Sequence, residues 1–219
     1  MPPDFRTKLT AAAEQLGLSL CDRQVDQLLA YLELIQKWNK VYNLTAVREP
    51  AAMLTQHLVD SLSALPPLMR HAGDRSLRLL DVGSGGGLPG VVIAICLPQF
   101  QIVCVDAVSK KARFIAQVAA ELGLTNLRGE HSRVEELKLP AFDVITSRAF
   151  ASLVDFTNLT RQHLAPGAVW AAMKGQHPAD ELAALPADLD VFHVEQLQVP
   201  GLDAQRCLIW IRPKSNAAA

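Results

Sequence analysis

LLDVGSGGGLPG, residues 79–90, is the stretch that decides the fold. A short apolar run at 78–82, typical of a buried strand, leads directly into glycines, and Pro89 opens an apolar run with helical character. Glycine permits positive φ angles and lets a ligand lie against the backbone. The first turn of the following helix directs its free amides at that ligand. The stretch therefore predicts a strand, a ligand-binding turn and a helix in an open α/β sheet.

The spacing of the glycines separates two kinds of nucleotide-binding turn. A dinucleotide fingerprint, G-x-G-x-x-G, would need glycine at position 88, where this chain has Leu88. Gly83, Gly85 and Gly87 instead form G-x-G-x-G, which resembles the S-adenosylmethionine motif. We therefore expect these three glycines, Ser84 and Leu88 to bind S-adenosylmethionine, and we disfavour a nicotinamide-dependent oxidoreductase. The alternative is a tight turn that binds no ligand.

Two further segments are candidates for the same cofactor. Asp106 follows the apolar run 102–105, where a carboxylate can accept both ribose hydroxyls of a nucleoside. Its alternative role is to favour the dipole of the next helix. In SRVEE, residues 132–136, backbone groups of Val134 and Glu135 are candidates to bind the adenine, although the segment could equally be an acidic helix start.

The chain changes character near residue 77, from helical spacing to an alternation of short apolar and helical runs. Ser19 and Asp22 form an expected capping box, and prolines 66–67 are expected to stop the third helix. The expected helices of the first part cover 5–16, a second segment that runs from the cap at Ser19 through Ile35, and 50–62, with a loop at 39–48. The expected later strands cover 78–82, 102–105, 143–146 and 169–173, with helices at 89–97, 109–122, 153–164 and 180–185 and a turn at 166–167.

This order predicts an α/β fold: a Rossmann-like class I methyltransferase with a seven-stranded, mostly parallel sheet and helices on both faces. The last apolar runs, 191–198 and 207–211, flank a Pro-Gly pair and predict an antiparallel pair of strands, which favours this class over the dinucleotide fold. We divide the chain into an N-terminal helical extension packed on the core (1–76), a catalytic domain (77–213) and a disordered tail (214–219).

Composition limits the partners and the compartment. Half of the 219 residues are apolar and the formal net charge is −1, so any contact with RNA must come from a local basic face or involve a substrate that other proteins help to present. The four cysteines lack paired spacing, which favours a reducing compartment. The N-terminus has no signal-peptide pattern and the longest apolar run, 91–97, is too short to span a membrane. We expect a soluble cytoplasmic protein without a membrane partner, and we single out no metal ligands.

Two familiar catalytic devices are missing from the places where they would be needed. Enzymes that methylate exocyclic base nitrogens commonly carry Asn/Asp-Pro-Pro-aromatic after the fourth strand, where this chain has SRAF at 147–150. Methylation of pyrimidine C5 needs a cysteine nucleophile, but Cys104 and Cys207 fall inside expected strands. Guanine N7 has a lone pair and no proton to lose, so it needs no general base. Orientation and desolvation would then suffice.

Two basic residues are candidates for a catalytic contribution. Arg148 ends a parallel strand at the ligand crevice, where it could bind the cofactor carboxylate or an RNA phosphate, or be a surface arginine. Lys174 ends the next strand, and a phosphate contact and an ordinary edge lysine are equally compatible with its position. Phe150 could stack on a base, although packing in the core is the favoured interpretation.

Several motifs together resemble the bacterial 16S ribosomal RNA guanine-N7 methyltransferases, also called glucose-inhibited division protein B. They are WNKVYNLT at 38–45, HLVDS at 57–61, the glycine loop, SRAF at 147–150 and MKG at 173–175. The resemblance implies a monomeric cytoplasmic enzyme that methylates N7 of a guanine in the decoding-region loop of 16S RNA, in free RNA or in a small-subunit particle. It also implies cofactor contacts by Gly83, Leu88, Val134, Glu135 and Arg148, with Asp106 as the acidic residue of the family. The main alternative is a methyltransferase acting on a small molecule, and a non-catalytic cofactor sensor stays open.

The segment 37–60 mixes basic and aromatic residues in a way that suits RNA, although packing of Trp38 into the core would explain it as well. His57, Asp60 and Ser61 share one helical face, and we favour a polar network that docks this helix on the catalytic domain over a nucleophile set. The candidates for binding RNA are Asn39, Lys40, Tyr42, Asn43, His57, Lys110, Lys111 and Lys174.

Overall fold

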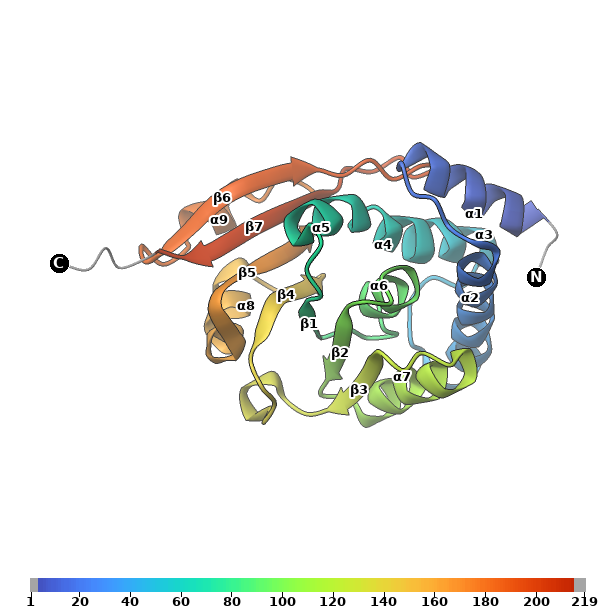
Figure 1. The fold of residues 1–219 in the computed structure, drawn as a ribbon, viewed down its shortest axis with the longest axis horizontal. Helices are drawn as coiled ribbons and strands as arrows, with labels where there is room; N and C mark the ends of the chain where they lie inside the picture. The colour runs from blue at the N-terminus through green and yellow to red at the C-terminus, as the bar shows by residue number, and fades with distance from the viewer. Residues whose placement is uncertain (1–3, 215–219) are drawn as a thin grey trace.

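A seven-stranded sheet forms the centre of the computed structural model, which describes residues 4–214 (Figure 1). The strands lie in the order β3-β2-β1-β4-β5-β7-β6, and β7 runs antiparallel to both of its neighbours while the other neighbouring pairs are parallel. They are β1 (Arg78–Val82), β2 (Gln101–Asp106), β3 (Leu127–His131), β4 (Phe142–Arg148), β5 (Leu164–Lys174), β6 (Leu189–Gln196) and β7 (Cys207–Pro213). The expected fold class is confirmed.

Helices cover both faces of the sheet, and each face has its own hydrophobic core (Figure 1). Because side chains alternate along a strand, Leu79 of β1 belongs to the first core and Leu80 to the second. The connections that cover the first face are α6 (Gly90–Cys96) and α7 (Ser109–Leu122), and those on the second are η2 (Val134–Glu136), α8 (Leu153–Thr160), η3 (Arg161–His163) and α9 (Ala179–Ala183). Because the strands that these connections join run parallel, their carboxyl ends lie along one common edge of the sheet.

The N-terminal helices extend the first core. Leu9, Leu28 and Leu58 are fully buried in the same cluster as Leu79 of the sheet. The connection between β6 and β7 reaches across to α1, where Val199 packs in a small third cluster (Figure 1). The helical elements are α1 (Asp4–Gln15), α2 (Asp22–Tyr42), α3 (Pro50–Met53), the π-helix η1 (Leu54–Val59), α4 (Asp60–Leu62) and α5 (Leu65–Ala72).

Two glutamines of α2 hold the ends of both helices that cover the first face. Gln24 Nε2 donates to the carbonyl of Cys96 over 3.0 Å, and Gln27 Nε2 donates to the carbonyl of Leu122 over 2.8 Å. These carbonyls close α6 and α7, and the last turn of a helix leaves such groups without partners. The extension thus contributes polar contacts as well as apolar surface.

Three local expectations are wrong. The cap of α2 is Cys21, whose backbone N–H donates to the Gln24 side chain, and Ser19 lies outside the helix. The expected loop at 39–48 begins later, because α2 continues to Tyr42 and ends on Asn43 with a left-handed φ of 49°. Prolines 66–67 begin α5 instead of ending the preceding helix, since proline is tolerated in a first turn, where its missing N–H would have no partner.

The expected turn at 166–167 lies inside β5, where the register with β4 shifts between Phe142 and Val144. At the C-terminus, the backbone N–H of Lys214 donates to the carbonyl of Asp188 over 2.8 Å, so the first residue of the expected tail is hydrogen bonded. The remaining tail residues, 215–219, lie outside the described part. Within residues 4–214, no helix combines the length and the apolar character that crossing a membrane requires.

Candidate cofactor and substrate site

The glycine loop joins β1 to α6 and is tied to the neighbouring strand. The N–H of Gly83 donates to the carbonyl of Val105 over 2.9 Å. Gly85 has a left-handed φ of 58°, and a Cβ built on it would meet nothing within 4 Å, so its backbone borders open space. Gly87 differs, because its φ is 89° and a Cβ would lie 2.4 Å from Val91 Cγ2. One glycine therefore leaves room for a ligand, and the other lets the helix pack closely.

Asp106 ends β2 beside this loop and is only 6% exposed. Its Oδ2 accepts the N–H of Gly85 over 2.9 Å, and its Oδ1 accepts the N–H of Val108 over 2.8 Å. Lys111 Nζ lies 3.6 Å from Oδ2. These contacts fix the carboxylate, and each oxygen keeps a lone pair that can accept a ribose hydroxyl.

Two cavities lie along the loop and share Gly83. The Asp106 cavity, of about 170 Å³, contains Asp106, Val134 and Glu135 in its lining. The loop cavity, of about 160 Å³, lies on the other side and is lined by Ile35, Leu44, Thr45, His57, Gly83, Ser84, Gly85, Gly86, Leu88, Arg148 and Ala149. All expected cofactor-binding residues except Gly87 therefore line one of the two cavities. An elongated nucleoside could extend across the loop from one to the other.

Two residues that line the loop cavity carry buried polar atoms without partners in the described part of the chain. Ser84 Oγ and His57 Nδ1 are buried, and neither has a hydrogen-bond partner among the described residues. Buried polar groups usually find partners, so such atoms fit a site that a polar ligand completes. The residues of this site thus fit the expected cofactor.

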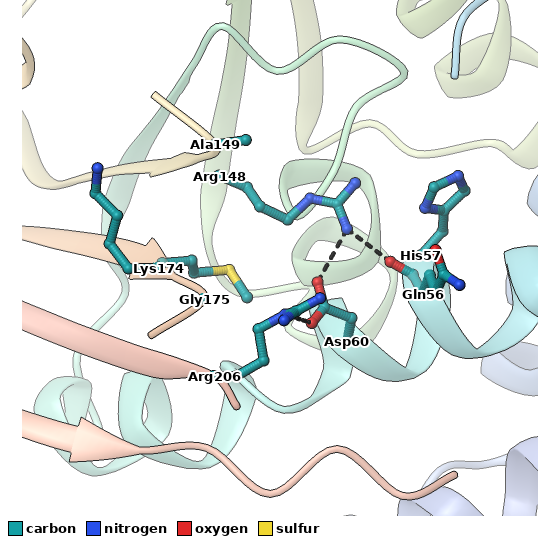
Figure 2. Close-up of a pocket in the computed structure, with 9 residues that line it drawn as sticks. Gln56, His57, Asp60, Arg148, Ala149, Lys174, Gly175 and Arg206 are labelled. Carbon is teal, nitrogen blue, oxygen red and sulfur yellow. Dashed lines mark hydrogen bonds and ion pairs between the residues drawn. The ribbon is translucent and has the colours of Figure 1, made fainter. Parts of the chain in front are cut away.

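Arg148, at the end of β4, connects the sheet to the N-terminal helices. Its Nη1 donates to the carbonyl of Gln56 over 2.9 Å and to Asp60 Oδ2 over 3.0 Å (Figure 2). The next residue, Ala149, has a φ of 63°, a left-handed conformation that is costly for residues other than glycine and clusters at functional sites. Of the three residues expected in a docking network, Asp60 joins their helical segment to the end of β4, whereas His57 contacts Thr45 of the N-terminal part and Ser61 Oγ has no hydrogen-bond partner among the described residues.

A third and larger cavity, the Arg148 cavity, lies beside the loop cavity and measures about 370 Å³. The two share His57, Arg148 and Ala149. Figure 2 shows residues of the Arg148 cavity, which is lined by Gln56, His57, Asp60, Arg148, Ala149, Met173, Lys174, Gly175 and Arg206. Because the two cavities share three lining residues, which form a shared wall, a reactant in the Arg148 cavity would lie next to a ligand in the loop cavity.

His57 forms part of that wall and is 5% exposed. Its Nε2 lies 2.9 Å from Thr45 Oγ1. Burial, and secondarily the positive charge of Arg148, lowers the pKa of His57 to about 4. The imidazole is therefore neutral near pH 7 and adds no charge to the site.

The candidates for binding RNA fall into different places. Asn39 is buried, where its Nδ2 donates to the carbonyl of Val47 and its Oδ1 accepts the N–H of Thr45, so its amide closes a loop instead of facing solvent. Lys174 Nζ donates to Glu181 and points away from the Arg148 side chain (Figure 2). Three candidates at the end of α2 and one at the start of α7 are exposed: Lys40, Tyr42, Asn43 and Lys110.

Trp38 and Phe150, for which the sequence allowed either packing or a contact with RNA, both pack against other side chains. Trp38 is half-buried, with its ring 5.2 Å from that of Phe114 on α7 and 5.0 Å from that of Tyr42. Phe150 packs against Phe156 at 5.5 Å. Packing is thus confirmed for both Trp38 and Phe150.

Arg206 is the main site residue that the sequence did not reveal. It precedes β7, and its Nε donates to Asp60 Oδ1 over 2.7 Å. The antiparallel register pairs Cys207 with Lys174 at the end of β5, which brings position 206 to the crevice. Knowing the register between β5 and β7 in advance would have indicated this position for Arg206.

Comparison with known proteins identifies the family. Residues 24–209 match the family model GidB, described as rRNA small subunit methyltransferase G. The chain is 61% identical to the ribosomal RNA small subunit methyltransferase G of Acidovorax sp. (strain JS42), covering 95% of this chain and 96% of that protein. It is 62% identical to the protein of that name from Leptothrix cholodnii, with complete coverage of both.

Solved structures agree on the fold. A SAM-dependent methyltransferase from Aquifex aeolicus aligns with a TM-score of 0.55 at 15% identity, covering 77% of this chain and 96% of that chain. At this identity the match supports the fold alone, and the sequence matches carry the assignment. This chain belongs to the GidB family of rRNA small subunit methyltransferases G.

Proposed function

We propose that this chain transfers a methyl group from S-adenosylmethionine to N7 of a guanine in the RNA of the small ribosomal subunit. The observation that carries the proposal is the meeting of two cavities at His57 and Arg148, one on the glycine loop and one large enough for a base. Family relatives named for the small-subunit ribosomal RNA support the choice of substrate.

The cofactor would be held by residues already brought together around the loop. Asp106 would accept the ribose hydroxyls, backbone groups of Val134 and Glu135 would bind the adenine, and Gly85 would let the ligand lie close. When bound, S-adenosylmethionine supplies a methyl group activated by its positively charged sulfur. Arg148, at the shared wall, is placed to bind the cofactor carboxylate with N–H groups that it does not use for Asp60.

The side chains around the wall suit a nucleophile that has no proton to lose. The pKa of His57, which burial lowers to about 4, makes its imidazole a weak base that is poorly suited to take a proton from a nucleophile. Cys104 is fully buried, and burial raises the pKa of its thiol well above its usual range, which disfavours thiolate attack on a pyrimidine. The protein's contribution is then to orient the base and to exclude water.

RNA would be guided by a local basic face, because the net charge of −1 gives little overall attraction. Lys40 at the end of α2 and Lys110 at the start of α7 are exposed, and packing of Trp38 on Phe114 joins these two helices. We infer a monomer that works in the cytoplasm on 16S RNA, either free or in a small-subunit assembly particle.

The deciding experiment uses small ribosomal subunits that lack the modification. The protein is incubated with labelled S-adenosylmethionine and subunits, and the digested RNA is analysed by mass spectrometry. Label in 7-methylguanine is the expected result. A protein that binds the cofactor but labels no RNA would overturn the proposal and favour a small-molecule methyltransferase.

A further inference from the structure

Asp60 is a buried carboxylate held between two arginines from distant parts of the chain. Its side chain is 2% exposed, its Oδ2 accepts Arg148 Nη1 over 3.0 Å, and its Oδ1 accepts Arg206 Nε over 2.7 Å. Arg148 ends β4, Arg206 precedes β7, and Asp60 begins α4. A buried charge is costly unless it is paired, so this group has a strong reason to keep its geometry.

Asp60 and both arginines line the Arg148 cavity, and the arginine side chains are the more exposed members of the group. The arginine side chains are 22% and 25% exposed, for Arg148 and Arg206 respectively. Arg206 uses Nε for Asp60 and Nη1 for the carbonyl of Gln205, and among residues 4–214 its Nη2 has no acceptor. The group carries a net charge of +1 and offers N–H donors to whatever enters the cavity (Figure 2).

A guanine matches this cavity in size and in chemistry. A volume of about 370 Å³ lies within the range of small-ligand pockets, roughly 300–1,000 Å³. Guanine presents O6 and N7 as adjacent acceptors on one edge, and arginine is the side chain that most often binds that edge. Because side chains cannot read this edge inside an RNA helix, the base must be splayed out to be reached.

We propose that Asp60 is a positioning residue, which holds Arg206 so that it donates to O6 of the target guanine and holds Arg148 at the wall between the two cavities. With O6 bound by Arg206, the adjacent N7 is left free and faces the loop cavity. This inference rests on the proposed function and adds to it the place where the base binds. The carboxylate also offsets one positive charge beside a purine that becomes positively charged on methylation.

The test compares Asp60→Asn, Arg206→Gln and the double variant, with unmodified small subunits as substrate. Each single change is expected to lower kcat at least about tenfold with KM for subunits within about threefold, because remote RNA contacts remain. In the Arg206→Gln background, the further effect of Asp60→Asn should be much smaller than in the wild type, since Asp60 acts partly through Arg206. A purely structural role of the pair would lower the free energy of unfolding but leave kcat per folded molecule close to that of the wild type.

Asp190→Asn is the matched control, because Asp190 on β6 also accepts a hydrogen bond from an arginine. Arg212 Nε donates to Asp190 Oδ2 over 2.9 Å, outside the site. It should keep the wild-type kcat. Should Asp60→Asn not fold, Arg206→Gln alone decides, since it keeps the bond between Asp60 and Arg148. Wild-type kcat in Arg206→Gln, or fully multiplying effects, overturns the inference alone. A wild-type protein that makes no 7-methylguanine overturns the proposed function, and this inference with it.

Discussion

His57 is placed where a positive charge would be costly. It is buried beside Arg148, its Nε2 contacts Thr45, and its Nδ1 has no partner among the described residues. Burial therefore lowers its pKa from 6.5 to about 4. Between pH 6.5 and about 4, His57 is largely protonated in the unfolded chain but neutral in the folded chain. The free energy of unfolding therefore decreases as the pH falls from about 6.5 toward 4.

Replacing His57 with glutamine should remove this pH dependence. We expect the stability of the wild type, relative to His57→Gln, to fall by about 2–3 kcal/mol between pH 7 and about pH 4.5, because each pKa unit is worth about 1.4 kcal/mol. Urea unfolding of both proteins at both pH values measures the difference. Equal differences at the two pH values would contradict a buried neutral histidine.

Asp106 provides a second prediction for a single residue. Asp106→Ala should weaken binding of S-adenosylmethionine about 10- to 100-fold, because it removes charge-assisted hydrogen bonds worth about 1.5–3 kcal/mol. The change also frees the N–H of Gly85, which the carboxylate now holds. Calorimetric titration measures the affinity. Asp155→Ala, at the exposed start of α8, should bind as the wild type does, and equal affinities for all three proteins would exclude a ribose contact.

Residues differ in how well the sequence could predict their place. The place of Asp106 could be predicted, because a strand pattern fixes where β2 ends and parallel strands end at the same edge. Arg206 was not, because its position depends on the pairing of β7 with β5. The partners of Asp60 also required the tertiary structure, although its helical face was apparent from spacing. Local patterns therefore predicted the positions of the residues around the glycine loop better than those around the Arg148 cavity.

At the scale of elements, α6 can pack on β1 because its first residue has no side chain. A Cβ on Gly90 would lie 2.3 Å from Cys104 Sγ and 2.8 Å from Asp81 Oδ2, both of which are buried. Gly90 N–H also donates to that carboxylate oxygen over 2.8 Å. Close approach, and not a special φ angle, thus sets the requirement for glycine here.

Gly90→Ala should therefore destabilise the fold by about 1–3 kcal/mol, the usual cost of overpacking a core. Chemical denaturation measures this change in the free energy of unfolding. Gly86→Ala is the matched control in the same loop, because a Cβ there meets nothing within 4 Å and its φ is not positive. Its stability should stay within about 0.5 kcal/mol of the wild type. Equal stability of the two variants would mean that α6 can move away from β1 at no cost.

The boundaries of elements were harder to predict than their order. Ser19 has the sequence pattern of a cap, yet α2 begins after Cys21, where Gln24 both accepts the Cys21 N–H and donates to Cys96 of α6. A tertiary contact thus competes with a local preference and sets the start of the helix. Prolines 66–67 illustrate the opposite ambiguity, because the same residues can end one helix or begin the next.

At the scale of the molecule, the helical extension and the sheet share one hydrophobic core. A chain that begins at Leu77 would expose the apolar surfaces of α6 and α7 and leave their terminal carbonyls without Gln24 and Gln27. We expect the truncated chain to lose cooperative unfolding and to bind the dye ANS, as loosely packed states do. Denaturant titration and dye fluorescence measure both properties.

A short Gly-Ser insertion between Arg75 and Ser76 is the control for that truncation. It lengthens the exposed connection from α5 to β1 but keeps both parts in one chain. Lengthening a loop costs little, about 0.6 kcal/mol for each doubling. The insertion variant should therefore unfold cooperatively. If the truncated chain also unfolded cooperatively and did not bind the dye, residues 77–213 would be an independent domain.

Charge acts at the scale of the whole molecule and gives the last prediction. With a net charge of −1, binding to free 16S RNA should be weak, because only a local face attracts phosphates, and it should fall further as salt rises. Changing exposed Lys40 and Lys110 to alanine should reduce the slope of log affinity against log salt by about two, because each lysine would no longer neutralise a phosphate. Lys8→Ala, whose charge is paired with Asp4 on α1, should leave the slope unchanged. Filter binding at several salt concentrations tests this, and an affinity that does not change with salt would exclude phosphate recognition by this face.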